Sequence, residues 1–283
     1  MDTLAHPKRI LIIGAGPSGI VTLRNLIKLG SFDRVEIVER RDDVGGVWYF
    51  DEDDENNASD TPRWPSPAYP GLIGNVLPEF LSFSGSPFPE PPTTPHQPFP
   101  TLRETYDYLR GFAEVYLERG NIRLNTEVVR VEELEDGKGW NVTTRDWRSP
   151  DRGEIRSEVW DAVVVCTGWY DDPLWPGTPG MEDLKKKGLA VHAKWYRGPQ
   201  KYTGKTAQRA LIIGNGNSAN DIAAHLVPLA KNPVYRSIRR PAFKHFVSLP
   251  DVRIKDVSPV KRFILQDNDK VTAELLDETI IEI

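Results

Sequence analysis

The apolar and polar positions of this chain repeat one pattern twice. A short apolar run, Arg9–Ile13, ends at a glycine, and apolar residues at helical spacing follow from Pro17 to Leu29. A second apolar run, Val35–Glu39, comes next, and a strand, a helix and a strand within about thirty residues form one βαβ unit. The same order returns later in the chain, at Ala210–Ile213, Ser218–Lys231 and Val234–Ile238.

The stretch between the two units has a different texture. Asp51–Asn57 is an acidic run that we interpret as a solvated loop, and the proline-rich stretch after it carries aromatic residues typical of packed irregular structure. Thr101–Arg119 returns to helical spacing. Alternating segments then predict antiparallel strands at Ile122–Leu134, Trp140–Thr144 and Glu154–Val159, before a buried strand at Asp161–Cys166.

These elements predict an α/β fold with two Rossmann-like dinucleotide-binding domains. The first domain, residues 1–170, holds a small antiparallel insertion, and the second domain occupies residues 171–283. A chain of 283 residues is long enough for two such domains. Its balance of 39% hydrophobic and 27% charged residues is that of a globular protein.

Charge and cysteine content exclude several classes of function. A net charge of −5 offers no basic surface for nucleic acid or an anionic membrane, and no apolar run approaches the ~20 residues that span a bilayer. Cys166 is the single cysteine, which excludes an internal disulfide and a dithiol reductase mechanism. We therefore expect a cytoplasmic protein that binds neither nucleic acid nor membrane.

The first strand and helix are joined by a glycine-rich loop, Gly14-Ala15-Gly16-Pro17-Ser18-Gly19. Its first glycine suits a tight turn, the second lets the backbone approach a pyrophosphate, and the third permits close packing of helix on strand. Phosphates then lie at the helix N-terminus, where free N–H groups and the helix dipole favour negative charge. Glu39, at the end of the second strand, would accept hydrogen bonds from ribose hydroxyls and repel a 2′-phosphate, so FAD or NAD is expected here.

A second glycine loop follows the later strand, and a positive charge lies beyond it. Arg239, next to Arg240, stands where the first unit has Glu39, and a guanidinium there suits a 2′-phosphate. The other interpretation of this arginine pair is a solvated surface. Opposite charges at the two positions predict two different dinucleotides, with NADPH in the second loop. The candidate contacts in that loop and its helix are Gly214, Gly216, Asn217, Ser218, Ala219 and Asp221.

Three further segments make the chain resemble the flavin-containing monooxygenase family over nearly its whole length. Gly45-Gly46-Val47-Trp48 is similar to the G-G-x-W segment that the family places beside the flavin, and Cys166-Thr167-Gly168 is similar to its A-T-G hinge. The segment from Gly188 through His192 to Tyr196 resembles the family's F-x-G-x-x-x-H-x-x-x-Y motif, with Lys186 in place of the Phe. The final tyrosine favours this family over the related Baeyer–Villiger enzymes, which tend to have Trp there.

The resemblance also implies roles for single residues. Asn75, after Gly74, falls where the family has an asparagine near the flavin and the nicotinamide, and it would act catalytically through hydrogen bonds. Val128 matches the position whose backbone meets the FAD adenine. Without the resemblance the same residues have structural interpretations: a turn for Asn75, a satisfied histidine for His192, and core packing for Trp48 and Tyr196.

The function that the resemblance implies is that of an FAD-dependent, NADPH-driven monooxygenase. NADPH reduces the FAD, the reduced flavin takes up O2 as a C4a-hydroperoxide, and a small amine or sulfide takes one oxygen atom. The alternatives are a catalytically silent nucleotide-binding homologue and a Baeyer–Villiger relative. The expected partners are a small organic substrate and O2, and a homo-oligomer stays open.

The end of the chain departs from the family pattern. The sequence stops at Glu278–Ile283, within what resembles a β-hairpin, whereas the family continues with a second D-x-V-I-x-x-T-G segment and a return to the FAD domain. We therefore expect a C-terminally truncated homologue. The open sheet edge would expose Ile280, Ile281 and Ile283, and we expect weak FAD retention and turnover that releases peroxide.

Overall fold

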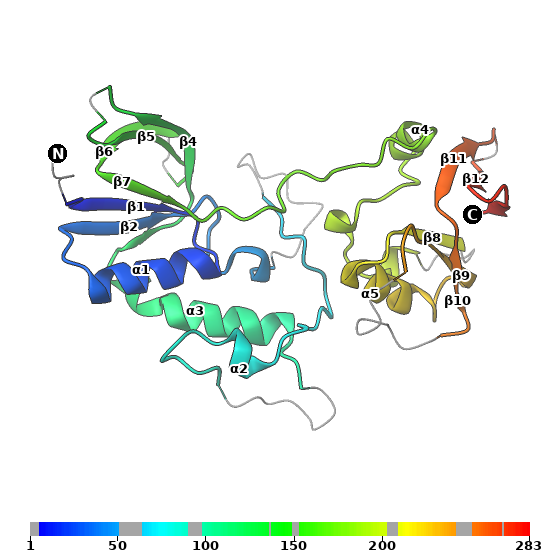
Figure 1. Ribbon diagram of the computed structural model, residues 1–283, viewed down its shortest axis with the longest axis horizontal. Helices are drawn as coiled ribbons and strands as arrows, with labels where there is room; N and C mark the ends of the chain where they lie inside the picture. The colour runs from blue at the N-terminus through cyan, green and yellow to red at the C-terminus, as the bar shows by residue number, and fades with distance from the viewer. Residues whose placement is uncertain are drawn as a thin grey trace. The chain divides into compact units, whose positions relative to one another are not determined.

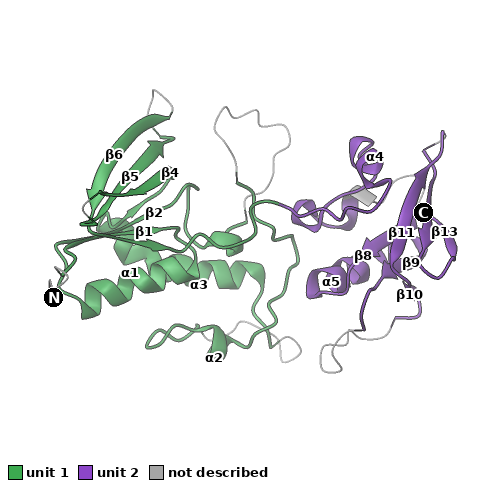
Figure 2. Ribbon diagram, turned by 45° about the horizontal axis from the view of Figure 1, so that its top comes forward, with its two compact units in different colours: residues 1–172 green, residues 173–283 purple. Residues whose placement is uncertain are grey.

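The structure, a computed structural model, describes residues 6–50, 64–89, 98–135, 137–148, 153–202, 209–241, 251–267 and 269–283. The chain divides into two compact units, Met1–Asp172 and Pro173–Ile283, which Figure 2 shows in green and purple. Each unit has a parallel sheet and a separate antiparallel sheet of three strands, so the predicted α/β class is confirmed. The acidic run Asp51–Asn57 lies outside the described residues.

The first unit is built on a four-stranded parallel sheet in the order β3-β2-β1-β7 (Figure 1). Its strands are β1 (Arg9–Ile13), β2 (Arg34–Val38), β3 (Ile122–Arg123) and β7 (Ala162–Val165), with helices α1 (Pro17–Leu29) and α3 (Leu102–Glu118). Helix α1 begins with Pro17, whose fixed φ suits the first helical position, and it ends before Gly30. Strand β1 and helix α1 have the bounds that the sequence predicts.

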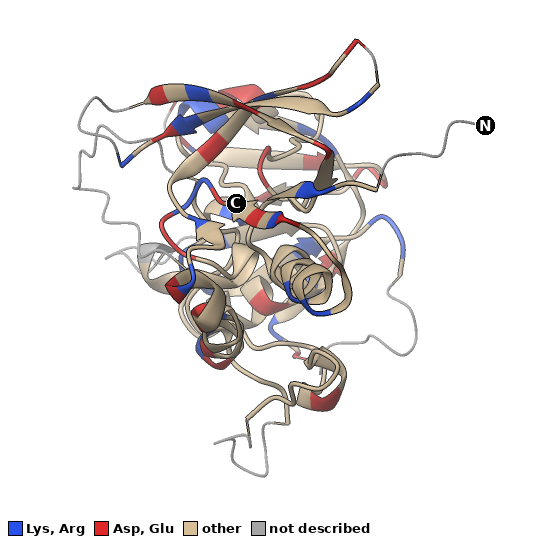
Figure 3. Cartoon of the chain, turned by 90° about the vertical axis from the view of Figure 1, so that its left-hand side faces the viewer, with Lys and Arg blue, Asp and Glu red and all other residues tan. Residues whose placement is uncertain are grey.

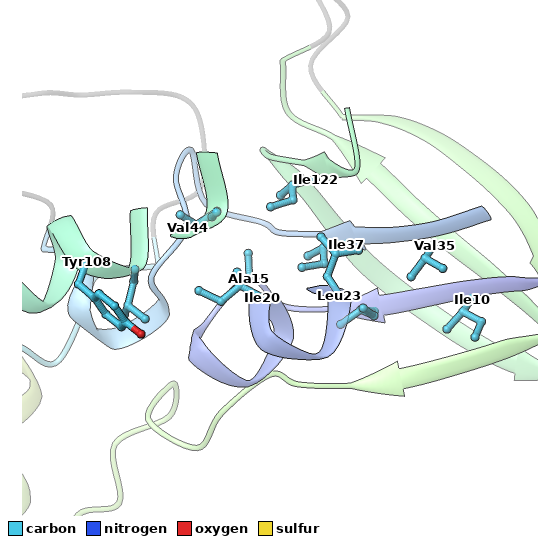
Figure 4. Packing of buried hydrophobic residues seen from close by; sticks show 12 residues of the cluster. Ile10, Ala15, Ile20, Leu23, Val35, Ile37, Val44, Tyr108 and Ile122 are labelled. Atoms are coloured by element: carbon cyan, nitrogen blue, oxygen red, sulfur yellow. The ribbon is translucent and has the colours of Figure 1, made fainter. Parts of the chain in front are cut away.

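Strand β1 is buried on both faces, which explains its uninterrupted apolar sequence. Ile10 points toward α1 and packs there with Ile20 and Leu23 (Figure 4). Leu11, the next residue, belongs to a second core with the fully buried Trp160. Because side chains alternate along a strand, one strand closes two cores. Each aliphatic side chain buried in this way contributes roughly 1.5–3 kcal/mol.

The antiparallel sheet of the first unit joins the second of these cores through Val142 and Trp160. Its strands are β4 (Thr126–Glu133), β5 (Trp140–Asp146) and β6 (Glu154–Trp160). Figure 3 shows acidic and basic residues side by side on these strands, and ion pairs such as Arg130–Glu132 and Arg156–Glu154 lie along them. The two signs of charge therefore cancel locally, without a surface of one sign on this sheet.

One predicted strand, Ile122–Leu134, is two strands in different sheets. Its first two residues form β3 and pair in parallel with β2, whereas β4 pairs antiparallel with β5. The chain turns between them at Asn125, which has φ +52°, a left-handed conformation that asparagine tolerates better than most residues. The apolar alternation runs through this turn, so the hydrophobic pattern did not mark it.

A capping box fixes where helix α3 begins. The hydroxyl of Thr101 accepts the N–H of Glu104 (3.2 Å), and the carboxylate of Glu104 accepts the N–H of Thr101 (2.7 Å). The residues before this cap are thereby held at one end of the helix. The unit is completed by the short helices η1 (Gly46–Trp48) and α2 (Pro78–Leu81).

The second unit repeats the strand–helix–strand order on a parallel sheet arranged β10-β9-β8. The predicted helix Ser218–Lys231 is too long: it ends at Leu226, because Pro228 has no N–H to continue the helix, and Lys231 already belongs to β9. The elements are α4 (Met181–Lys186), η2 (Ala193–Trp195), η3 (Pro199–Tyr202), β8 (Arg209–Ile213), α5 (Asn217–Leu226), β9 (Lys231–Ser237), β10 (Ile254–Val257), β11 (Val260–Leu265), β12 (Val271–Leu275) and β13 (Ile280–Glu282).

The antiparallel sheet of the second unit packs one face into a hydrophobic core. Ala273 and Leu275 of β12 are at most 1% exposed and share a core with Phe263 of β11. On β13, Ile281 is 7% exposed and joins this core, whereas Ile280 is 64% exposed. The predicted apolar row of Ile280, Ile281 and Ile283 on an open edge is therefore wrong, because neighbouring side chains of a strand point to opposite faces.

We predict opposite effects of alanine at two helical glycines of the first unit. A Cβ on Gly19 would lie 1.9 Å from the carbonyl oxygen of Gly14, so Gly19→Ala should lower the free energy of unfolding by about 1–3 kcal/mol. Nothing lies within 4 Å of a Cβ on Gly111 of α3, so Gly111→Ala should raise it by about 0.5–1 kcal/mol. Urea unfolding measures both, and equal midpoints for the two variants would contradict the close packing of α1.

Candidate nucleotide-binding sites

The first glycine loop has the geometry of a nucleotide-binding turn. Gly14 has φ +102°, and a Cβ there would meet the carbonyl oxygen of Cys166 at 2.7 Å. At Gly19, the contact with the Gly14 carbonyl leaves no room for a side chain of any kind. These close approaches hold the N-terminus of α1 against the end of β1, as the spacing of the glycines predicts.

The N-terminus of α1 has no side-chain cap. Gly16 is the N-cap residue, and the first turn contains no acidic residue. A Cβ built on Gly16 meets one atom within 4 Å, the Cα of Gly46 at 3.7 Å, so the backbone surface beside the helix end is open. The first N–H groups of the helix, from Ser18 onward, and the positive end of its dipole therefore offer a place for a phosphate.

Glu39 lies directly after β2 and is held from several directions. Its Oε2 accepts the N–H of Ala15 (2.8 Å), and its Oε1 accepts the N–H of Arg41 (3.0 Å). Its own N–H donates to the carbonyl of Arg123 (2.9 Å), and its carbonyl accepts the N–H of Thr126 (2.7 Å). The residue is only 8% exposed. Each carboxylate oxygen keeps a second lone pair, which can accept a hydroxyl group beside the glycine loop.

A second turn, Gly45-Gly46-Val47-Trp48, packs against the glycine loop. The N–H of Gly45 donates to the carbonyl of Ala15 (2.9 Å), and the two glycines have φ +109° and +57°. The guanidinium of Arg41 donates to the carbonyls of Gly46 (2.8 Å) and Tyr49 (2.7 Å). Within the turn Val47 is 37% exposed and Trp48 packs on the main core. The structure thus brings this predicted segment to the first loop.

Helix α3 clamps the same turn through Asp43. The hydroxyl of Tyr106 donates to Asp43 Oδ2 (2.5 Å), and Arg110 Nε lies 3.1 Å from Asp43 Oδ1. The Tyr106 ring also stacks on Tyr49 at 5.4 Å. Burial and the bond to Asp43 raise the pKa of Tyr106 to about 12. Sequence reasoning missed this clamp, because 63 and 67 positions separate Asp43 from its partners.

Val128 lies on β4, an edge strand of its sheet. Trp147 donates to the carbonyl of Asn125 (2.9 Å), and such bonds recur at every second residue of an antiparallel pair, so β4 meets β5 at residues 125 and 127. The N–H and C=O of Val128 therefore point to the open edge of β4. At this same edge Thr126 reaches the carbonyl of Glu39. A base held near Glu39 can pair with the backbone of Val128.

Asn75 lies in a loop that is attached to the start of α3. The N–H of Gly74 donates to the carbonyl of Pro100 (2.8 Å), and Ile73 forms an antiparallel bridge with Thr101. Asn75 itself is exposed. These pairings fix the backbone of Asn75 beside the N-terminal cap of α3 rather than on the glycine loop.

The hinge segment after β7 begins at the end of the parallel sheet. The N–H of Cys166 donates to the carbonyl of Ile13 (2.8 Å), which continues the sheet by one residue. Burial raises the pKa of the Cys166 thiol, which keeps it protonated and unreactive. Thr167 and Gly168 are exposed, and Gly168 has φ +71° where the chain leaves the sheet.

The second glycine loop has the same turn with more room. Gly214 has φ +126°, and its N–H donates to the carbonyl of Ser237 (3.0 Å). A Cβ on Gly214 would lie 3.9 Å from the Cβ of Ala219, an ordinary contact that explains why alanine fits in the third position. Gly216 begins α5 without a side-chain cap, and nothing lies within 4 Å of a Cβ there. The first turns of α5 contain Asn217, Ser218 and Asp221.

One backbone hydrogen bond in each unit, from the first glycine of the loop to the end of the next strand, shows which residues after β2 and after β9 are equivalent. The N–H of Gly14 bonds to Val38 (2.9 Å), and the matching bond of the second loop ends at Ser237. The residues that follow are Glu39 in the first unit and Ile238 in the second. The predicted equivalence of Glu39 with the first arginine is therefore wrong by one residue, because the second connection is one residue shorter.

The arginine pair lies next, and both side chains, Arg239 and Arg240, are exposed. The carbonyl of Arg240 accepts a hydrogen bond from Nδ2 of Asn215, a residue of the glycine loop (3.2 Å). Sequence reasoning missed this contact, because a bond to a backbone carbonyl leaves no mark on the partner's residue type. The second site thus has the backbone of the arginine pair bonded to its loop and an apolar residue at the Glu39 position.

The motif around His192 ties its own segment to α5. His192 Nδ1 accepts the N–H of Lys194 (3.1 Å) at the start of η2, and burial lowers the pKa of the imidazole, so the ring is neutral. Tyr196 is 2% exposed, and its hydroxyl lies 3.3 Å from His225 Nδ1 on α5. The first contact holds the start of η2, and the second holds Tyr196 beside α5.

Within the ranges that the structure describes, no group of three or more His, Cys, Asp or Glu side chains is arranged to hold a metal ion. Nor does any helix in that part of the chain have both the length and the hydropathy to cross a membrane.

Comparison with known proteins gives consistent matches. A family model described as "FMO-like: Flavin-binding monooxygenase-like" matches residues 7–244. "Flavin-containing monooxygenase FMO GS-OX-like 9" of Arabidopsis thaliana is 34% identical over 239 residues, which cover 80% of this chain and 50% of that protein. "Flavin-containing monooxygenase 5" of Homo sapiens is 33% identical over 244 residues, covering 83% and 41%. The chain spans about half the length of the curated relatives it matches.

Solved structures are similar over most of the chain. S-allyl-L-cysteine S-oxygenase from Allium sativum has a TM-score of 0.74 at 28% identity, covering 97% of this chain and 60% of that one. Tmm from Pelagibacter sp. strain HTCC7211 also has a TM-score of 0.74, at 21% identity, covering 96% and 59%. Cyclohexanone monooxygenase has a TM-score of 0.55 at 22% identity, covering 84% and 40%. The last two likenesses concern the fold alone.

We predict that the clamp on Asp43 weakens in alkali. The pKa of Tyr106 is raised to about 12, so the neutral phenol stabilises the folded state below pH ~10, and this stability is lost as the pH rises through 12. The difference in unfolding free energy between the protein and Tyr106→Phe should therefore shrink between pH 10 and 12. Urea titrations over this range measure it, and a constant difference would contradict the role of the phenol proton.

Proposed function

The chain belongs to the flavin-binding monooxygenase-like family, and from this premise we propose that it binds FAD at its first glycine loop and NADPH at its second, and transfers one oxygen atom of O2 to a small organic nucleophile. The observation that carries the proposal is the pair of uncapped helix N-termini, those of α1 and α5, each behind a glycine turn. The residues at the two ribose positions differ in charge, which supports two different dinucleotides. The chain spans about half the length of its curated relatives, so we propose the oxygen transfer for this chain and do not take it from them.

Three features of the first loop fit FAD. The open backbone at Gly16 would take the pyrophosphate, where any side chain would occupy the space. Glu39 would accept the ribose hydroxyls, and its fixed negative charge would repel a 2′-phosphate. The edge groups of Val128 would pair with the adenine. Of the two dinucleotides, this set suits the one without a 2′-phosphate.

The second loop fits NADPH for the opposite reason. Gly216 leaves the N-terminus of α5 open for the pyrophosphate. Ile238 places no carboxylate at the ribose, so a 2′-phosphate meets no fixed negative charge there. Arg239 and Arg240 would supply guanidinium groups, which bind phosphate through paired, charge-assisted hydrogen bonds.

The cofactors would supply the oxygen activation and the reducing equivalents, and the protein would supply binding and orientation. Asn75 would orient the reacting groups through its amide without ionising. His192 would hold its own segment in place, because its Nδ1 accepts the N–H of Lys194. Cys166 would stay outside the redox chemistry, because burial keeps its thiol protonated.

A sulfide is the substrate class that we favour. The solved relative with 28% identity carries the name S-allyl-L-cysteine S-oxygenase, which supports sulfur as the atom that receives oxygen in this chain too. An amine nitrogen is the other soft nucleophile that such chemistry accepts. Both require little from acid–base residues, which agrees with the neutral character of Asn75.

The decisive experiment is the absorption spectrum of the purified chain with added FAD, followed by anaerobic addition of NADPH. The proposal expects flavin bands that NADPH bleaches and that air restores, with sulfoxide formed when a thioether is present. A chain that never takes up flavin would refute the proposal. If the chain binds flavin but NADPH does not reduce it, the result would favour the alternative of a catalytically silent nucleotide-binding homologue.

We predict that Gly16→Val abolishes flavin binding while the fold persists. A Cβ at this position makes only an ordinary contact at 3.7 Å with Gly46, yet it enters the space that the pyrophosphate needs. Flavin retained after gel filtration measures binding, and circular dichroism reports the fold. The matched control is Gly177→Val, because nothing lies within 4 Å of a Cβ on Gly177. A yellow Gly16→Val protein with full occupancy would overturn the assignment.

We predict that the protein prefers NADPH over NADH and that Arg239→Ala removes most of this preference. Loss of a charge-assisted pair to the 2′-phosphate should cost roughly 2–3 kcal/mol of discrimination. The measurement is the ratio of kcat/KM for flavin reduction by the two nucleotides. Arg253→Ala serves as the control, since Arg253 is engaged with Asp251 (2.7 Å) in the same unit. Equal use of both nucleotides by the unmodified protein would refute the assignment.

A further inference from the structure

The two glycine loops are tied to their neighbouring strand ends in opposite directions. In the first unit a side chain after the strand, Glu39, reaches back to the backbone N–H of the loop residue Ala15 (2.8 Å). In the second unit the loop residue at the same place is Asn215, and its side chain reaches out to the backbone carbonyl of Arg240 (3.2 Å). Because a carbonyl only accepts, the amide NH2 of Asn215 is the donor.

Which partner supplies the side chain of this bond decides whether the residue after the strand must be charged. A carboxylate that holds the loop must remain beside it, so the first unit keeps its negative charge there. When the loop residue supplies the donor, the position after the strand needs no polar group, and Ile238 occupies it. The bond to Arg240 also holds the backbone of the arginine pair next to the loop, while both guanidinium groups stay exposed.

Arg236, which lies on β9 before the arginine pair, already has partners for its guanidinium. Its Nε and NH2 donate to the two carboxylate oxygens of Asp256 (2.7 and 3.0 Å), and its NH1 donates to Asn220 of α5. Its side chain is only 14% exposed. A guanidinium neutralised in this way adds little attraction for a further anion, so of the described arginines from residue 231 to 241, Arg239 and Arg240 suit the phosphate better.

We propose that Asn215 is a positioning residue for 2′-phosphate specificity, which holds the Arg239–Arg240 backbone at the second glycine loop, and that Ile238 is the residue whose lack of charge admits the phosphate. This inference rests on the proposed binding of NADPH at this loop. It assigns the specificity to one side-chain bond and one apolar position, in addition to the guanidinium that contacts the phosphate. Asn215 acts through the arginine pair and touches no reacting atom.

The test is calorimetric titration of the full chain with NADP+ and with NAD+, in excess FAD so that the first loop is filled. Asn215→Ala should lower the ratio of the two affinities roughly three- to tenfold, the size expected for one lost hydrogen bond. The loss should fall on NADP+, with NAD+ affinity nearly unchanged, whereas a general structural defect would weaken both. Asn215→Gln, which keeps an amide donor, should restore part of the ratio.

The matched control is Asn121→Ala in the first unit. Asn121 Nδ2 also donates to a backbone carbonyl, that of Val35 (3.1 Å), so the variant loses the same kind of bond away from the second loop. If Asn215→Ala changes the ratio of NADP+ to NAD+ affinity no more than Asn121→Ala does, the positioning role of Asn215 is overturned. Titration of the unmodified chain and of Arg239→Ala shows separately whether the second loop prefers NADP+ over NAD+. If the unmodified chain has no such preference, the proposed NADPH site fails, and this result differs from an unchanged ratio in Asn215→Ala alone.

Ile238→Glu tests the second half of the inference. The variant places a carboxylate at the position that Glu39 holds in the first unit, so NADP+ affinity should fall roughly tenfold or more while NAD+ affinity is kept or improved. Ile238→Gln, which has nearly the same size without the charge, should change the ratio much less. Equal losses of NADP+ affinity in both variants would show that side-chain size and not charge matters at this position, which would overturn the assignment of Ile238.

Discussion

The approach of α1 to the end of β1 is the contact on which the first nucleotide site depends. Gly19 lies so close to the carbonyl of Gly14 that no side chain fits between them. Moving the helix away from the strand would expose Ile20 and Leu23, which are fully buried beneath this contact. The same closeness places the backbone of Ala15 where it bonds both to Glu39 and to the Gly45 turn. Apolar burial thus supplies the free energy that holds a set of polar backbone groups in one place.

Features marked by residue type could be predicted from the sequence, and features made by long-range contacts could not. Glycine and proline punctuate β1 and α1 so clearly that their bounds followed from the pattern, and the place of Glu39 at the end of the second strand followed from the apolar run before it. The break at Asn125 was hidden because the alternation of apolar residues continues across it. The Asp43 clamp was hidden because its partners lie on α3, more than sixty positions away.

The second unit repeats the backbone arrangement of the first loop with different side chains around it. The turn, the uncapped helix and the strand-end hydrogen bond are common to both loops, and the differences lie in side chains at equivalent positions. Ala219 is accepted where the first unit requires Gly19, because its Cβ lies at an ordinary 3.9 Å from a Cβ built on Gly214, whereas a Cβ on Gly19 would lie 1.9 Å from the carbonyl oxygen of Gly14. The connection from the second glycine loop to the end of β9 is one residue shorter than the matching connection in the first unit. Counting residues from the glycines therefore pairs Glu39 with Arg239, whereas the hydrogen bonds pair it with Ile238.

The missing side-chain caps of α1 and α5 have a consequence for the stability of the protein without its ligands. A side-chain N-cap is usually worth ~1 kcal/mol, whereas α1 and α5 begin at glycines without one, so a phosphate bound there, as proposed, would take its place. A ligand held at one hundred times its Kd adds about 2.7 kcal/mol to the folded state. If the nucleotides bind as proposed, each helix start would be completed only in the bound state, so the free chain would unfold more often than the loaded one.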